Sequence, residues 1–517
     1  MKCHLRAVFS LVLFTIFFLW AGCGGEDQEP IPLDPAENQP GDGDADADGD
    51  GDGDGDGDGE VGTNGDGDGE EPDPDNPVID GEACSDDTHC QSNTCLPAPD
   101  WPDGYCSTVG CSTFEDCANE EGSDANRCLQ NPRGDNFCIR ICNPSTGEPC
   151  RSGYQCQPIG TAGDGWCAPN PNDVSDIDGD FPFEVHCEST VNSTADISYG
   201  VSDDSTSYMV VPLTGGGGWL DPVNITTASG TTINFRQENS FQTAGAQLFG
   251  SVNPTVIPAA PQFGFQLDSG LHTYRLNTQD AEMCYFIIES SGPSTTIDLN
   301  IYLVGLDGIT ASNAASSPHL QAMISHAESL YNQADISFGE VRYLSVSSEA
   351  ESAYSTIRSQ GDVGALAAQS TYPGTDRDSV LSANIFIVRR FAFSGGGGVL
   401  GLSQGIPGVA GLHGTAISGV ALTGQYLGYD LGGGINGNEF TANVLAHELG
   451  HFLGLFHTSE TNGRRFDPLE DTPECTDFSN PTGCPDWGNL MFPMADIRND
   501  TVTSDQSYVI GVNPLTK

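Results

Sequence analysis

The feature that most restricts the fold of this chain is a histidine pattern near its C-terminal end. Residues 438–460 contain the pattern His-Glu-x-x-His-x-x-Gly-x-x-His. The first two histidines, His447 and His451, have the i, i+4 spacing that places both rings on one face of a helix, where both can bind the same ion. Gly454 tolerates a positive φ, so it predicts the point where the helix ends and the chain reverses.

The reversal brings His457 to the same ion as a third ligand and leaves a fourth position open, as in catalytic zinc sites. Glu448 follows the first ligand directly and is placed to act as a general base toward a water at that position. The alternative is that the histidines pack in a glycine-rich core. That alternative is disfavoured because the protein has only 10 histidines, and three of them stand at this one spacing. We therefore predict a zinc site formed by His447, His451 and His457.

The charge balance excludes nucleic acid as a partner. The 517 residues include 73 Asp and Glu against 17 Lys and Arg, a formal net charge of −56, which leaves no surface suited to a phosphate backbone. Residues 24–80 alone hold 22 acidic side chains and no basic one. Such a stretch cannot bury enough apolar area to fold, so we predict a disordered acidic Gly/Asp linker over 23–80. The alternative is calcium binding, because Asp-x-Asp-x-Asp-Gly begins an EF-hand loop, but the closing Glu and the flanking helix are missing.

The first residues predict export. Two basic side chains in residues 1–6 precede an apolar run over 7–20, and Ala21-Gly22-Cys23 follows. The run is shorter than the about 20 residues of a membrane-spanning helix, and small residues at its end are typical of a cleaved signal peptide. A Cys after Ala-Gly resembles the bacterial lipoprotein signal, which implies a signal peptide over 1–22 and a lipid anchor on Cys23 at the outer membrane or cell surface. Plain secretion and an uncleaved anchor are the alternatives.

Twelve of the 18 cysteines form a repeat of four between Cys84 and Cys167. Their even number, the lack of Cys-x-x-Cys pairs and the exported context favour disulfide bonds over zinc. Four cysteines allow three connectivities in each unit, and the sequence does not choose among them. We predict a disulfide-rich module of three units over 81–168, in which cross-links replace a large core and which serves as a partner-binding surface or as a spacer.

Residues 176–292 change to short β-branched runs separated by turn signals, which predicts an antiparallel β-sandwich. Cys187 and Cys284 lie near its two ends and are expected to form a disulfide bond. The alternative is that one of them is a thiolate that blocks the metal site, as in some latent metalloproteases. An exported pair of cysteines favours the bridge.

The extended histidine motif resembles the metzincin clan of zinc endopeptidases. The residues that follow it resemble more specifically the pappalysin (cytophagalysin) family: a Thr after His457, Asp471-Thr472-Pro473, a cysteine pair and Asn489-Leu490-Met491. The resemblance implies that Met491 is the Met-turn residue beneath the zinc, with Met494 as the alternative. It also implies that Cys475 and Cys484 close a small loop beside the cleft. Pro493 departs from the family, which has at that position a Tyr that assists the oxyanion.

The resemblance and the pattern together imply a multidomain protein. An α+β zincin-like (metzincin) catalytic domain over 293–517 follows the antiparallel β-sandwich and the disulfide-rich repeat module. The implied function is that of an exported, membrane-tethered zinc endopeptidase that hydrolyses protein or peptide substrates with a zinc-activated water and Glu448 as general base. Calcium is a second candidate ion, with Asp467, Glu470 and Asp471 as candidate ligands. The rivals are a non-catalytic surface adhesin with a degenerate protease fold, and a zinc hydrolase acting on cell-wall amides.

Three further segments of the catalytic domain carry expectations. An edge strand that pairs with extended substrate is expected in or near Gly411–Leu422. Residues 401–405 match the hydrolase pattern Gly-x-Ser-x-Gly, but the Pro407 and Gly408 that follow cannot readily start the helix that this motif needs, so a loop is predicted. His413 is expected to be polar surface.

Overall fold

The computed structural model describes residues 77–517 in part. It leaves out 86, 97–103, 118–125, 131–135, 143–149, 151–153, 159–164, 170–180, 191–192, 214–219, 236–251, 259–266, 279–281, 292–294 and 394–397. The predicted signal peptide, the lipidation site Cys23 and almost all of the acidic linker lie outside the described residues. Among the helices that are described, none has both the length and the apolar character needed to cross a membrane.

The C-terminal part is built on a five-stranded sheet with the order β16-β15-β18-β21-β20. Its strands are β15 (Thr296–Val304), β16 (Ser337–Leu344), β18 (Ser382–Val388), β20 (Gly401–Ser403) and β21 (Val420–Thr423). The first four strands in this order are parallel, and β20 runs antiparallel to β21 at the edge. A small parallel pair, β17 (Thr356–Ile357) and β19 (Arg390–Phe391), lies beside the sheet. The edge strand is therefore β20, and the predicted region 411–422 contributes to the internal strand β21 instead.

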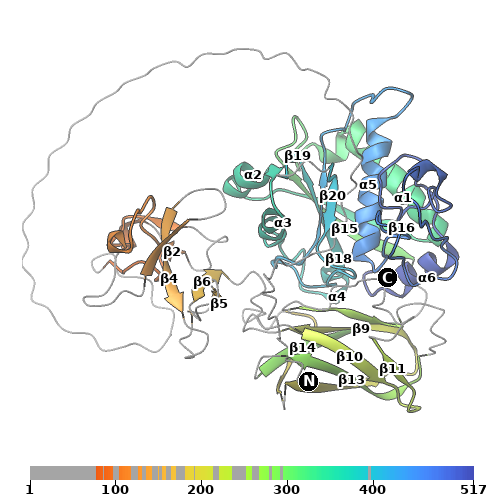
Figure 1. Cartoon of the computed structure of the whole chain (residues 1–517), viewed down its shortest axis with the longest axis horizontal. Coiled ribbons are helices and arrows are strands. Elements are labelled where there is room, and N and C mark those ends of the chain that lie inside the picture. The colour runs from red at the N-terminus through yellow and green to blue at the C-terminus, as the bar shows by residue number, and fades with distance from the viewer. Residues whose placement is uncertain are drawn as a thin grey trace, which may run out of the picture.

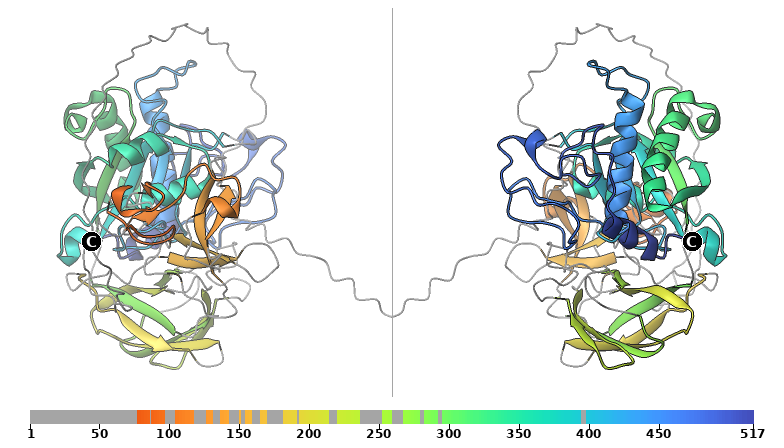
Figure 2. Two further views of the ribbon diagram at one scale, coloured as in Figure 1. Left: turned by 90° about the vertical axis from the view of Figure 1, so that its left-hand side faces the viewer. Right: turned by 90° about the vertical axis from the view of Figure 1, so that its right-hand side faces the viewer.

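Helices cover both faces of this sheet, as Figures 1 and 2 show. They are α1 (Pro318–Tyr331), α2 (Ser348–Tyr354), α3 (Gln360–Ala367), α4 (Arg377–Val380), α5 (Gly437–Phe452) and α6 (Ser504–Val512). Successive side chains of a strand point to opposite faces of the sheet, so the sheet divides the core into two parts. Leu299 and Ile301 of β15 pack in the cluster that contains α1 and α5, whereas Tyr302 and Val304 pack with α2 and α3. Burial of both faces explains why β15 is apolar almost throughout.

Helix α1 forms for local reasons that its own residues supply. Ser317 caps the helix by accepting a hydrogen bond from the backbone of Leu320, and Pro318 occupies the first turn. At the other end of α1, the buried hydroxyl of Tyr331 donates to the carbonyl oxygen of Ala446 in α5, at 2.9 Å. The two helices lie side by side (Figure 2), so α1 supports the helix that carries the histidine motif.

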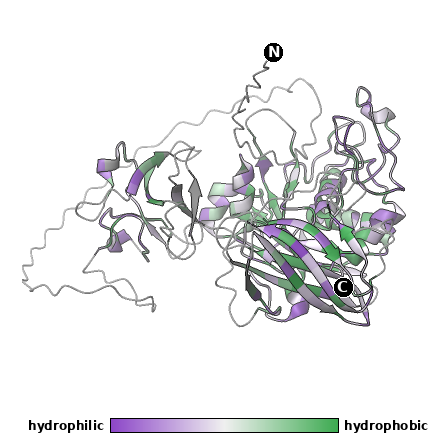
Figure 3. Cartoon of the chain, turned by 60° about the horizontal axis from the view of Figure 1, so that its bottom comes forward, coloured by the Kyte–Doolittle hydropathy of each residue, from purple (hydrophilic) through white to green (hydrophobic). Residues whose placement is uncertain are grey.

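Residues 186–291 form two four-stranded antiparallel sheets with the orders β11-β10-β13-β8 and β12-β9-β14-β7. The strands are β7 (His186–Ser189), β8 (Thr194–Val201), β9 (Ser205–Leu213), β10 (Leu220–Thr226), β11 (Thr232–Asn234), β12 (Thr255–Ile257), β13 (Gly270–Thr278) and β14 (Glu282–Ser291). Side chains of both sheets meet in one buried cluster, which includes Ile197, Val210 and Tyr274. Hydrophobic and hydrophilic residues alternate along these strands in Figure 3. Cys187 and Cys284 pair directly across β7 and β14 and are bonded, so neither is a free thiolate.

The second of these sheets turns its other face to the catalytic domain. Met209 and Val211 of β9 and Phe286 of β14 belong to the same buried cluster as α5. The hydroxyl of Ser207 donates to the carbonyl oxygen of Val512 in α6, at 2.6 Å. Because these buried apolar contacts continue from the sandwich into the C-terminal part, the two parts share one core.

The Cys-rich region contains two small antiparallel sheets. They are formed by β1 (Cys95–Leu96) with β2 (Tyr105–Cys106), and by β3 (Asn126–Gln130), β4 (Asn136–Cys142), β6 (Gly165–Pro169) and β5 (Tyr154–Pro158). In the first two units, the first cysteine bonds to the third and the second to the fourth: Cys84–Cys95, Cys90–Cys106, Cys111–Cys128 and Cys117–Cys138. The bond Cys150–Cys167 repeats the second-to-fourth pairing in the third unit. The structure thus selects one of the connectivities that the sequence left open.

Candidate metal centre

Helix α5 and the turn after it position the histidines. The side chain of Asn436 caps the start of the helix by accepting from the backbone of Asn438. The helix ends after Phe452, and Gly454 adopts a φ of +109°, a conformation that side-chain-bearing residues rarely adopt. The backbone of Leu455 then bonds to the carbonyl oxygen of Gly450, which closes the turn at 2.9 Å. The predicted role of Gly454 as the point of reversal thus agrees with the observed backbone.

The turn brings the three histidine rings to a common point. The Nε2 atom of His457 lies 3.2 Å from Nε2 of His447 and 3.2 Å from Nε2 of His451. All three rings are buried. Their ligand atoms form one of the groups in the described residues that are close enough to hold a metal ion together.

The opposite nitrogen of each ring has a hydrogen-bond acceptor. Nδ1 of His447 lies 2.8 Å from the carbonyl oxygen of Leu490, Nδ1 of His451 lies 2.7 Å from that of Leu455, and Nδ1 of His457 lies 3.2 Å from Oε1 of Glu460. A neutral imidazole that donates from Nδ1 carries a lone pair on Nε2. The three lone pairs therefore face one another, an arrangement that repels unless a cation lies between them.

Burial also keeps these rings in the form that binds metal. It lowers the pKa of His447 to about 3, with the charge of His457 as the second cause. Burial lowers the pKa of His451 well below its usual value, and the other two histidines act in the same direction. His447 and His451 are consequently neutral at pH 7, as metal ligands must be. Three converging imidazole nitrogens with oriented Nδ1 protons fit a zinc ion.

Glu448 follows His447 on α5, and its side chain lies against the edge strand β20. Its side chain is buried, and its Oε2 atom has no hydrogen-bond partner among the described residues. Gly401 of β20 packs so closely that a Cβ there would stand 2.5 Å from Cγ of Glu448. Burial raises the pKa of Glu448 to about 8, while a backbone hydrogen bond from Ser403 opposes the rise. A carboxyl group with a pKa near neutrality can both accept and return a proton.

Met491 lies beneath the metal ligands, in a turn that holds two of their segments. A Cβ on Gly450 would stand 2.7 Å from Sδ of Met491, so the glycine makes room for the sulfur. The carbonyl oxygen of Met491 accepts from the backbone of Thr458, and that of the preceding Leu490 accepts from His447. Met494 packs instead in a separate cluster with the Cys475–Cys484 disulfide. Of the two candidates for the Met-turn, the geometry favours Met491.

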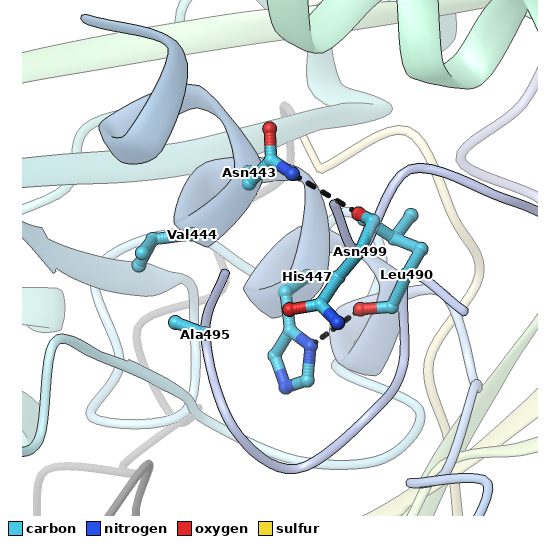
Figure 4. A pocket seen from close by; sticks show the side chains of 6 residues that line it. All are labelled: Asn443, Val444, His447, Leu490, Ala495 and Asn499. Carbon is cyan, nitrogen blue, oxygen red and sulfur yellow. Dashed lines mark hydrogen bonds between the residues drawn. The ribbon is translucent and has the colours of Figure 1, made fainter. Parts of the chain in front are cut away.

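A pocket opens next to the first ligand, as Figure 4 shows. It is lined by Asn443, Val444, His447, Leu490, Ala495 and Asn499. Both polar groups of Asn443 are engaged: its amide nitrogen donates to the carbonyl oxygens of Asp496 and Asn499, and its oxygen lies 3.1 Å from Nε2 of His326. The wall therefore offers mainly apolar surface from Val444, Leu490 and Ala495, and none of its six lining residues carries a charge at pH 7.

Two other residues singled out from the sequence lie away from the metal ligands. His413 is buried rather than exposed: its ring bonds to the Asn384 side chain and to the carbonyl oxygen of Val380, which makes it part of a structural network. Burial lowers its pKa to about 4. Residues 401–405 form β20 and a turn, with no helix after them, so the Gly-x-Ser-x-Gly match is not a nucleophile elbow.

The segment after His457 holds a buried carboxylate, Asp486, that the sequence pattern did not indicate, and Asp467, which was already a candidate calcium ligand. Asp486 is buried, and its Oδ2 accepts from the hydroxyl of Thr458 at 2.7 Å while its Oδ1 has no partner among the described residues. Asp467 bonds to Thr472 through Oδ1, and its Oδ2 likewise lacks a partner there. Asp471 instead binds the start of α6, and Glu470 is exposed. The spacing of residues in the sequence could not identify Asp486, because the disulfide loop Cys475–Cys484 brings it next to Thr458 only in the folded chain.

Comparison with known proteins agrees with this geometry. Residues 307–504 match the model of Reprolysin_5, metallo-peptidase family M12. A solved archaemetzincin from Methanopyrus kandleri is 16% identical, with 32% of this chain and 78% of that chain covered and a TM-score of 0.23. Among curated proteins, none matches. The match over residues 307–504 supports a zinc-dependent metallopeptidase domain of the metzincin type in this part of the chain.

Proposed function

We propose that this chain is an exported zinc endopeptidase whose metal is held by His447, His451 and His457 and whose general base is Glu448. The observation that carries the proposal is the convergence of the Nε2 atoms of three buried histidines, each of which faces a hydrogen-bond acceptor with its Nδ1 atom. The buried carboxylate of Glu448 directly follows the first of them in the chain. A structural cluster of histidines has no need of three oriented lone pairs. The match to the M12 peptidase family supports the same reaction class.

His447, His451 and His457 would hold the zinc, which when bound would lower the pKa of a water and polarise a substrate carbonyl. The Glu448 carboxylate takes the proton of the attacking water and returns it to the leaving amine. The edge strand β20 pairs with an extended peptide through its free backbone groups, which lays the scissile bond beside Glu448. Pro493 has no hydroxyl group, so it cannot supply the help to the oxyanion that the pappalysin-type Tyr would give.

The pocket beside His447 supports a preference for a small, uncharged substrate side chain. Its wall is mainly apolar, and the side-chain amide of Asn443 already donates to the carbonyl oxygens of Asp496 and Asn499 in the neighbouring loop. A charged side chain would enter without a partner, at a cost of several kcal/mol. The pappalysin-like assignment within the metzincins remains part of the proposal.

The other regions are proposed to place the protease outside the cell. In this arrangement residues 1–22 are a lipoprotein-type signal, Cys23 carries the lipid anchor, and 23–80 are a spacer. The Cys-rich module over 81–168 and the sandwich over 176–292 then precede the catalytic domain over 293–517. The disulfide bonds suit an oxidising, exported location. The core shared by the sandwich and the protease supports a fixed spacing between the two.

Calcium is proposed as a second ion, near Asp467 and Asp486. Both carboxylates have an unpartnered oxygen within the described structure, and Thr458 connects them through its hydroxyl and its carbonyl oxygen. Buried carboxylates without a cation destabilise the fold, and oxygen-rich sites prefer calcium.

The function can be tested on the mature chain from residue 23 onward, with Glu448→Gln as the variant. Wild type should hold one zinc per chain and cut a reduced, unfolded protein. Glu448→Gln should keep the zinc and lose cleavage by a factor of about 10² or more, since the general base is gone. Equal cleavage by the two proteins would refute the mechanism. Zinc binding without cleavage by the wild type would instead favour the surface adhesin.

A further inference from the structure

The three metal-ligand histidines do not have equivalent supports. His447 and His451 direct Nδ1 to backbone carbonyl oxygens, at 2.8 and 2.7 Å. His457 directs Nδ1 to a side chain, Oε1 of Glu460, at 3.2 Å. The ring of His457 is 3% exposed and the side chain of Glu460 is 17% exposed, so this contact is largely shielded from water.

Glu460 is held in place by its own backbone and not only by the ring. It stands in a turn between Ser459 and Phe466, which form a β-bridge, and its backbone nitrogen donates to the carbonyl oxygen of Arg465 at 2.8 Å. Gly463 within this turn has a φ of +61°, and a Cβ there would stand 2.4 Å from the carbonyl oxygen of Thr476. The turn is therefore packed tightly against the disulfide loop.

A second contact fixes the start of the turn. The hydroxyl of Ser459 accepts from the backbone of Cys475 at 2.8 Å, and Cys475 is bonded to Cys484. The disulfide loop, the turn and the third histidine thus form one continuous chain of contacts. Because the backbone of Glu460 is anchored at both ends of the turn, its carboxylate is presented to the ring in a fixed orientation.

The charge of Glu460 is directed at the histidine. Among the described residues, Glu460 forms its ion pair with His457, and no Arg or Lys side chain shares the carboxylate. A carboxylate that accepts the Nδ1 proton fixes the tautomer of the ring and makes Nε2 a stronger electron donor. A backbone carbonyl oxygen also fixes the tautomer of the ring. Because it carries no net charge, it strengthens Nε2 as an electron donor less than a carboxylate does.

We propose that Glu460 is a positioning residue for the metal site, which orients His457 and strengthens it as a ligand through the anchored turn 459–466. The inference rests on the proposed zinc site. It assigns a role to a residue outside the three ligands and the base, and it makes His457 the ligand most sensitive to the structure of the disulfide loop.

The test compares Glu460→Gln and Glu460→Ala in the mature chain, with zinc affinity measured by competition with a chromogenic chelator. Loss of a carboxylate behind a histidine ligand should weaken zinc binding by about 10- to 100-fold in Glu460→Ala. Glu460→Gln should lose less, because its amide oxygen still accepts from Nδ1. Glu474→Gln removes the same charge from an exposed position in the same segment and should bind zinc as wild type does.

A second readout separates positioning from simple stabilisation of the turn. The visible absorption of the Co²⁺-loaded protein reports the ligand field, and it should change in Glu460→Ala and stay unchanged in Glu474→Gln. If Glu460→Ala does not fold, the near-isosteric Glu460→Gln decides the question. Wild-type zinc affinity and an unchanged Co²⁺ spectrum in the Glu460 variants would overturn the inference while leaving the zinc site intact. Failure of the wild type to bind zinc would overturn the proposed function itself.

Discussion

Gly401 and Glu448 touch across the boundary between the edge strand and the active helix, so closely that a methyl group on Gly401 would stand 2.5 Å from Cγ of the glutamate. This contact relates two segments that are separated by almost fifty residues. It places the backbone on which substrate is proposed to pair directly beside the proposed base.

Gly401→Ala should therefore reduce catalysis while leaving the zinc in place. The added methyl group pushes the carboxylate away from its position, and a displacement of about 1 Å can cost about 10²-fold in rate. The measurement is kcat/KM on a peptide substrate, with the zinc content determined in parallel. Gly361→Ala, where the nearest atom would be 3.6 Å from the new Cβ, is the matched control and should keep full activity. Equal losses in both variants would contradict the steric argument.

Met491 and Met494 should respond differently to truncation. Met491 is fully buried beneath the ligand turn, so Met491→Ala leaves a cavity and should cost about 2–5 kcal/mol in the free energy of unfolding, together with weaker zinc binding. Met494 is only partly buried, so Met494→Ala should cost less and leave zinc affinity unchanged. Denaturant unfolding and zinc titration of both variants provide the check, and a reversed order would move the Met-turn to Met494.

Asp467 should make the metal-free protein less stable as the pH rises. Burial, with Asp471 and Asp486 as further causes, raises the pKa of Asp467 to about 7 from the ordinary 3.8. Between these two values the folded state holds a proton that the unfolded state releases, so stability falls as the pH rises through this window. The effect is on the order of 4 kcal/mol above pH 7.

The thermal midpoint of Asp467→Asn relative to wild type should consequently increase from pH 4 to pH 7 in the absence of metal. Stability changes from His447 and His451 have the opposite sign, because burial lowers their pKa values, but they are common to both proteins and cancel in the difference. Calcium chloride should raise the midpoint of wild type more than that of Asp467→Asn. A difference that does not vary with pH would argue against an ionising Asp467.

Ala495 should control which substrates are cleaved. It lines the pocket beside His447, so Ala495→Phe should fill the pocket and restrict cleavage to bonds followed by glycine or alanine (Figure 4). Val444→Ala, which also lines the pocket, should widen it and admit larger side chains. The checks are cleavage-site profiles on a mixed peptide library, and identical profiles for all three proteins would place the side-chain subsite elsewhere.

Much of the site could be predicted because its pattern is short-range. The helix carrying His447 and His451, the reversal at Gly454 and the approach of His457 all lie within eleven residues, where helix geometry and one positive φ decide the outcome. Helix α1 was predictable for a similar reason, because its capping residue and the residues of its buried face lie within one short segment of the sequence. The Cys187–Cys284 bond was predicted because the two cysteines lie near the ends of the sandwich in a chain that is expected to be exported.

Other features depended on contacts between distant segments. The edge strand was expected near residues 411–422, but it is β20, because strand order depends on how the chain crosses over the sheet and not on local hydrophobicity. The supports of the ligands are equally non-local: the carbonyl oxygen of Leu490 reaches His447 across more than forty residues. Asp486 reaches Thr458 through the cysteine loop.

The sequence by itself determined which three histidines are the candidate metal ligands and the spacing that lets them converge, since both are properties of one helix and one turn. Only the tertiary structure decided the environment of those residues: which carbonyl or carboxylate supports each ring, which strand lies against Glu448, and what lines the pocket. The physical reason is that spacing along a helix is set by backbone geometry, whereas burial, pKa and hydrogen-bond partners are set by segments that meet only when the core is packed.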